Sequence, residues 1–133
     1  MQLDIRFLRK ILNTIQEKQS HYVLTTELFE DVSEFYDGMN REDYKDLFFG
    51  HLLLLKDNNV IEEIGSNNNL GIGYMANGIS FVKTKIRLTS TGYDFIKVLN
   101  QNGIVDKLKS YTITECLKVV DIVIAHGISN FLS

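Results

Sequence analysis

Residues 79–89 read ISFVKTKIRLT. Apolar and charged side chains alternate along it with a period of two residues, which is typical of a β-strand with one buried face. The apolar face is formed by Val82, Thr84, Ile86 and Leu88. The opposite face is formed by Phe81, Lys83, Lys85 and Arg87. The pattern therefore predicts a strand that presents a row of cations beside an aromatic ring.

A partner strand is predicted immediately upstream, at VIEEI (residues 60–64). The residues between the two strands, 65–78, include four glycines and four asparagines, so we expect a hairpin with a long, flexible tip. The GIGYMANG segment of that tip lacks the G-x-G-x-x-G register and has no helix after it. A phosphate-binding loop is therefore not expected.

Three helices are predicted before the hairpin. The first runs from a cap at Asp4 to about Lys18 and buries Ile5, Leu8, Leu12 and Ile15. The second begins at Thr25 or Thr26 and buries Leu28, Val32 and either Phe35 or Tyr36. The third begins at Asn40 and ends at Asp57. A short extended stretch, Tyr22 to Leu24, separates the first two.

After the hairpin, helices are predicted from Ser90 or Thr91 to Leu99, over about 104–110 and over about 114–126. The order helix, short strand, helix, helix, two-stranded wing, helix is that of a winged helix-turn-helix of the α+β class. We expect residues 1–101 to form the winged-helix domain. Residues 102–133 are expected to be a C-terminal helical extension packed on the same domain.

Three blocks of the sequence resemble an uncharacterised winged-helix family of phages and prophages. DIRFLRKILNTIQE resembles the opening D-x-x-L-[IV]-R-K-I-L helix of that family, HLLLLKDNNVI resembles its central block, and RLTSTGYDFI resembles its R-L-T-x-x-G-x-[DE]-F motif. Two tryptophans of the family pattern are replaced here by Ser90 and Val105, and the wing tip is longer. The family has no agreed activity, so the resemblance implies a fold and a phage or mobile-element origin.

Composition and hydropathy favour a cytoplasmic protein without disulfides or membrane-spanning helices. The single cysteine among 133 residues excludes an internal disulfide, and we expect a cytoplasmic protein. No apolar run reaches the roughly 20 residues of a membrane-spanning helix, and the N-terminal stretch does not resemble a signal peptide.

The net charge of −3 is unevenly distributed: residues 27–63 hold three basic and eleven acidic side chains.

No catalytic site is expected, and no cofactor or metal. The histidines and Cys116 show no metal-ligand spacing. His51 lies in a leucine-rich helix and is interpreted as a packed core or helix-surface histidine. Cys116 is interpreted as an inert, half-buried thiol.

The first functional hypothesis is a DNA-binding transcriptional regulator, since winged helices often bind double-stranded DNA. The predicted contacts are Arg41, Tyr44, Lys45, Phe81, Lys83, Lys85 and Arg87. The cationic row on the strand would neutralise phosphates. The same row has an alternative interpretation, because edge strands often carry lysine to prevent aggregation.

The second hypothesis is a phage protein that binds and inhibits a host factor, for example a defence protein. Its acidic surface, Glu27, Glu30, Asp31 and Glu34, would meet a basic host protein. These carboxylates would oppose DNA binding beside the third helix. The fold favours the first hypothesis, and the distribution of charge favours the second.

A homodimer is also predicted, because the helix near 114–126 is apolar on more than one side. The residues expected at its two-fold interface are Val119, Val120, Ile122 and Val123. The alternative is a helix covered on both sides by its own chain.

Overall fold

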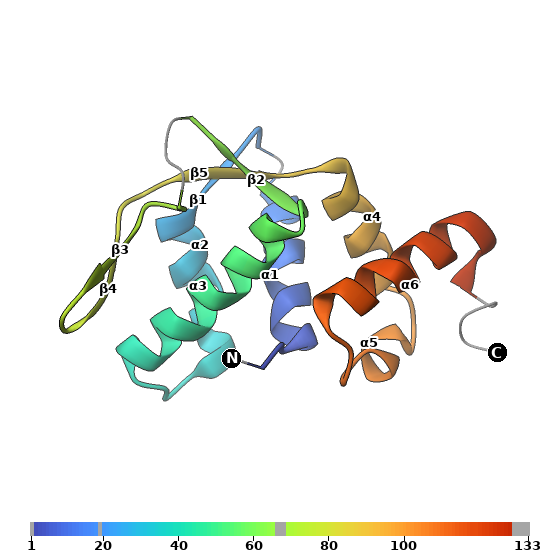
Figure 1. The fold of residues 1–133 in the computed structure, drawn as a ribbon, viewed down its shortest axis with the longest axis horizontal. Coiled ribbons are helices and arrows are strands. Elements are labelled where there is room, and N and C mark those ends of the chain that lie inside the picture. Colours follow the sequence, from blue (N-terminus) through green and yellow to red (C-terminus); the bar gives the residue numbers. More distant parts are fainter. Residues whose placement is uncertain (1, 19, 66–68, 129–133) are drawn as a thin grey trace.

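The computed structural model describes residues 2–18, 20–65 and 69–128 and has a mixed α+β architecture (Figure 1). Six α-helices lie in this part of the chain: α1 Ile5–Glu17, α2 Thr25–Asp31, α3 Arg41–Asp57, α4 Ser90–Leu99, α5 Ile104–Lys107 and α6 Ile113–His126. A 3-10 helix, η1, spans Ser33–Tyr36. The strands are β1 Val23–Leu24, β2 Ile61–Ile64, β3 Ile72–Met75, β4 Gly78–Phe81 and β5 Lys85–Leu88. The predicted α+β class is confirmed.

β5 is the central strand of a three-stranded antiparallel sheet with the order β1-β5-β2. β2 pairs with all four residues of β5, and β1 joins the other edge, where Val23 lies opposite Ile86. Ile86 and Leu88 are buried, whereas Lys85 and Arg87 are exposed. The predicted alternation is therefore confirmed along β5, and its apolar face covers the core.

The strand predicted over 79–89 is two strands in the structure. β4 pairs with β3 in a separate two-stranded sheet, which projects at one side of the molecule (Figure 1). The Phe81 ring packs on Phe29 and Phe49, with centroids 5.2 and 4.6 Å apart, whereas Val82 is 61% exposed. The predicted faces of Phe81 and Val82 are therefore wrong. The alternation changes phase between β4 and β5 because the two strands belong to different sheets.

The first and third helices begin at their predicted caps. The Asp4 carboxylate accepts the backbone N–H groups of Arg6 and Phe7 at 3.1 and 3.2 Å, and the Asn40 side chain accepts that of Asp43 at 2.9 Å. The predicted stripe of α1 is fully confirmed, since its members are at most 6% exposed: Ile5, Leu8, Leu12 and Ile15. This stripe forms one wall of the core.

The second predicted helix is shorter than expected. α2 has seven residues and is followed by η1, whose tighter turn changes the direction of the side chains. Leu28 and Val32 are buried as predicted, whereas Phe35 is 37% exposed. Tyr36 is half-buried and donates its hydroxyl hydrogen to the Asp4 carboxylate. The 3-10 segment therefore connects the acidic part of the chain to the start of α1.

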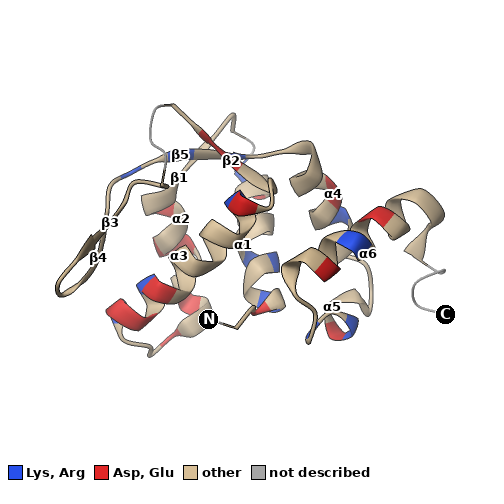
Figure 2. Cartoon of the chain, viewed as in Figure 1, with Lys and Arg blue, Asp and Glu red and all other residues tan. Residues whose placement is uncertain are grey.

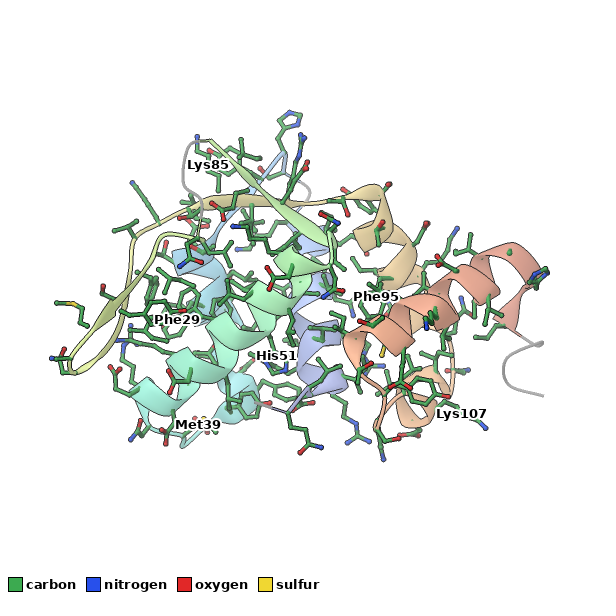
Figure 3. The ribbon with its side chains drawn as sticks, in the orientation of Figure 1. Phe29, Met39, His51, Lys85, Phe95 and Lys107 are labelled. Atoms are coloured by element: carbon green, nitrogen blue, oxygen red, sulfur yellow. The ribbon has the colours of Figure 1, made fainter. Side chains whose placement is uncertain are left out.

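His51 is completely buried, the first of its two predicted positions, and lies on the side of α3 that faces α1 (Figure 3). Its Nε2 accepts the backbone N–H of Asp4 at 3.0 Å, so this nitrogen carries no proton. Its Nδ1 then donates to the carbonyl oxygen of Leu47 at 2.7 Å. Burial lowers the pKa of His51, and the ring bridges α3 and α1 in its neutral form.

The C-terminal helix α6 packs against α4. Val119 and Val120 are 5% and 3% exposed and belong to the core, so their predicted place at a two-fold interface is wrong. Ile122 is 44% exposed and Val123 is half-buried. The sequence showed that α6 is apolar on several sides, but α4 takes the side that carries Val119 and Val120. Among the described residues, no helix has the length and apolar character needed to cross a bilayer.

We expect His51 to make the stability of the protein depend on pH. Its folded-state pKa lies below the ordinary value near 6.5, so the unfolded chain binds more protons as the pH falls past that value. The stabilisation by the neutral ring is complete above pH 6.5 and is lost below it. His51→Gln should therefore show a smaller loss of unfolding free energy between pH 7 and pH 5 than the parent in urea titrations. His21→Gln, at an exposed position, is the control, and equal losses in parent and His51→Gln would contradict this role.

Candidate interaction surface

Tyr44, predicted to contact nucleic acid, lies in the core. It is 6% exposed, its hydroxyl donates to the Phe29 carbonyl oxygen, and its ring lies 4.6 Å from the Phe29 ring. Burial, with the Glu30 carboxylate as a second cause, raises the pKa of the phenol. This position contradicts a nucleic-acid contact by Tyr44. Phe81 packs in the same aromatic cluster, beside the labelled Phe29 of Figure 3, and is therefore half-buried rather than outward-facing.

The two predicted cations of α3 are paired with carboxylates. The Arg41 guanidinium lies 3.4 Å from the Glu30 carboxylate and 5.0 Å from the centre of the Phe29 ring. The Lys45 ammonium lies 2.8 Å from the Glu42 carboxylate and donates to the Ile79 carbonyl oxygen at 3.1 Å. The Lys45 side chain is only 16% exposed. Each cation is thus paired within the chain, although the Arg41 side chain stays 61% exposed, and Lys45 also fixes β4 to α3.

The cations around β5 differ from one another. Arg87 forms an ion pair with Glu62 on β2. The Lys85 ammonium lies 4.6 Å from the centre of the Tyr22 ring. Lys83 is exposed and forms no ion pair within the described part of the chain. Lys83 and Lys85 are therefore the two predicted DNA contacts whose charge is not offset by a carboxylate.

Exposed carboxylates dominate the surface of α2, η1 and the first two turns of α3 (Figure 2). We call this the acidic region, and it consists of Glu27, Glu30, Asp31, Glu34, Asp37, Glu42, Asp43 and Asp46. Three of the eight are paired with Lys18, Arg41 and Lys45. The other five form no ion pair with a described residue, so the region keeps a strong negative charge.

The β3–β4 hairpin lies beside the acidic region. It is part of the uncharged hairpin, which we define as residues 69–82, a stretch without Lys, Arg, Asp or Glu. Gly78 has a φ of +135°, and a Cβ at this position would lie 2.3 Å from a carboxylate oxygen of Glu42. At the far end of the hairpin, Tyr74 and Met75 are 70% and 63% exposed.

Sequence reasoning missed Tyr74 and Met75 because it interpreted their segment as a flexible tip. Asn77-Gly78 between two short apolar stretches was the available signal, since Asn-Gly favours a tight hairpin turn. The glycines and asparagines around it concealed that signal.

Three observations concern metal binding, the cysteine and the grooves of the described residues. No group of three or more His, Cys, Asp or Glu side chains among residues 2–18, 20–65 and 69–128 is arranged to hold a metal ion. Cys116 is completely buried, more than the predicted half, and burial raises the pKa of its thiol to about 11. An open groove of about 960 Å³ contains His21, Arg87 and Tyr93 in its lining, but the Arg87 guanidinium there is already paired with Glu62.

Lys45→Met should loosen the uncharged hairpin. The substitution keeps an apolar stem but removes the ammonium that joins the Ile79 carbonyl to the Glu42 carboxylate. We expect a loss of about 1 kcal/mol in unfolding free energy. Amide hydrogen exchange in β3 and β4 should become faster, while exchange in α6 stays unchanged. Lys83→Met is the control, and equal exchange in the two variants would show that Lys45 does not hold the hairpin.

Comparison of the chain with protein-family models, with curated proteins and with solved structures gives no match. The resemblance to a phage winged-helix family therefore stays a prediction.

Proposed function

We propose that the chain is a non-enzymatic winged-helix protein that binds a basic protein through its acidic region. The winged-helix assignment is supported by the element order from α1 to α4 and by the strand order β1-β5-β2. In this interpretation α3 occupies the recognition position. Residues 1–101 form the winged helix, with 102–133 as its extension. A phage origin, a host factor as the partner and a cytoplasmic location belong to the same proposal.

One observation carries the choice of partner: the cations at the start of α3 are used inside the chain. Arg41 pairs with Glu30 and Lys45 pairs with Glu42. A DNA-binding helix gains affinity by neutralising phosphates with such side chains. Five carboxylates of the acidic region form no ion pair with a described residue, and two of them, Asp43 and Asp46, lie on the first turns of the same helix, where they would repel a phosphate backbone. A surface rich in Lys and Arg is electrostatically complementary to it.

DNA binding is the second candidate, and the positions of Lys83 and Lys85 favour it. Both side chains are exposed, neither is paired with a carboxylate, and they lie two residues apart near the start of β5. Lys83 and Lys85 flank Thr84, which pairs with Thr25 at the start of α2. The two candidates therefore use different side chains on neighbouring parts of the surface.

Random-sequence 24-base-pair duplex DNA separates the two candidates. If the acidic region faces the partner, fluorescence anisotropy at 150 mM NaCl should show a Kd weaker than about 100 µM, the weak end of non-specific binding. Micromolar binding that weakens with salt would contradict the protein proposal. Binding of that kind should also be lost on replacement of Lys83, Lys85 and Arg87 by alanine.

The protein partner is tested with two variants of equal charge change. The test variant is Glu34→Gln, Asp43→Asn, Asp46→Asn in the acidic region. The control variant is Glu17→Gln, Asp57→Asn, Asp121→Asn at exposed positions outside it. Extract from the cells in which the protein occurs is passed over immobilised parent and variants, and retained proteins are quantified by mass spectrometry.

We expect a protein of net positive charge that is retained by the parent and the control, elutes in 0.5 M NaCl, and is reduced at least tenfold on the test variant. Equal retention by all three chains, or a retained protein of net negative charge, would overturn the proposed function.

A further inference from the structure

The uncharged hairpin contains the three most exposed of the large hydrophobic side chains in the described residues. Tyr74, Met75 and Val82 are 70%, 63% and 61% exposed, compared with 54% for Tyr93 on α4. An isolated exposed hydrophobe is ordinary on a protein surface. Three within nine residues, on a hairpin that projects from the body of the molecule, indicate a contact surface (Figure 1).

The base of this hairpin is fixed to the body of the protein. Phe81 packs on Phe29 and Phe49, and the Lys45 ammonium donates to the Ile79 carbonyl oxygen. Gly71 is closely packed too, because a Cβ there would lie 2.5 Å from Thr84 Oγ1. The position of the tip is therefore set before any partner binds, which lowers the entropic cost of binding.

The surroundings of the tip indicate the chemistry of its partner. The hairpin has no cation of its own, and its base contacts Glu42, at the edge of the acidic region. Phosphates of DNA or of an anionic bilayer would find no cation between residues 69 and 82, where Lys83 is the next one along the chain, and they would be repelled by the carboxylates of the acidic region. An apolar cleft bordered by Lys and Arg side chains is complementary to the apolar tip of the hairpin and to the carboxylates of the acidic region.

We propose that Tyr74 and Met75 insert into an apolar cleft on the basic protein that the acidic region binds. This inference rests on the proposed function and adds the anchor of the interface. An aromatic ring and an adaptable thioether at the centre, with charges at the rim, match the usual anatomy of a protein–protein interface. Val82, on the connection from β4 to β5, extends the apolar contact toward the base of the hairpin.

The test compares two pairs of substitutions at exposed hydrophobic positions. The tip variant is Tyr74→Ser, Met75→Ser, and the control variant is Tyr93→Ser, Ile122→Ser on α4 and α6. Because all four side chains are at least 44% exposed, both variants should keep the thermal midpoint of the parent to within a few degrees. The probe is the positively charged protein retained by the parent chain, purified and titrated by calorimetry.

We expect the tip variant to weaken binding at least tenfold, with a smaller negative heat-capacity change, while the control changes the Kd less than twofold. A photo-crosslinker at position 74 should react with apolar cleft residues of the partner, and the same group at position 93 should not react.

Unchanged affinity of the tip variant, with loss in the Glu34→Gln, Asp43→Asn, Asp46→Asn variant, would overturn the anchor and leave the proposed function standing. Unchanged affinity in both would overturn both. If the parent chain binds random duplex DNA and the tip variant does not, the tip contacts a groove of DNA and not a cleft of a protein. This outcome would also overturn the inference.

Discussion

Asp4 is the residue on which the arrangement of the helices depends. Its carboxylate caps α1 and accepts the hydroxyl of Tyr36 from η1, while its backbone N–H donates to His51 of α3. Burial and the Asp4 carboxylate raise the pKa of Tyr36, so its hydroxyl stays a donor. Leaving one buried polar group unpaired costs about 1–3 kcal/mol. Asp4 therefore holds together the three elements that place the acidic region at the surface.

The ion pairs of α3 connect the charge of the surface to its shape. Lys45 neutralises Glu42 and, with the same ammonium, holds β4 through the Ile79 carbonyl. A cation that would otherwise face a ligand is thus used to fix the hairpin. The Arg41 guanidinium also has two partners within the chain, the Glu30 carboxylate and the Phe29 ring. The contacts of the Lys45 ammonium therefore both lower the free positive charge at the start of α3 and fix the position of the hairpin.

Local patterns predicted much of the fold, because caps and periodicity depend on neighbouring residues. The caps Asp4 and Asn40 and the alternation along β5 follow from the sequence and are confirmed. The acidic charge near α3 was also visible in the sequence, but the pairing of Arg41 with Glu30 was not, since these side chains come from α3 and α2. Lys45 and Glu42 lie three residues apart on α3, a spacing at which such pairs form.

The wrong predictions concern side chains whose burial depends on segments that are distant in the sequence. Phe81 turns inward because Phe29 and Phe49 offer it an aromatic cluster, and the change of phase before β5 leaves no local signal. Val119 and Val120 face α4, and periodicity alone does not show which apolar side of a helix meets its own core.

The central claim is that the acidic region and the uncharged hairpin together form the surface that binds a basic protein. Hydrogen exchange of the chain, alone and in complex with the retained positively charged protein, tests this claim most directly. Slower exchange is predicted in α2, η1, the first turns of α3 and the β3–β4 hairpin, with α6 unchanged. Protection confined to α4 and α6, with none between Glu27 and Asp46, would contradict it.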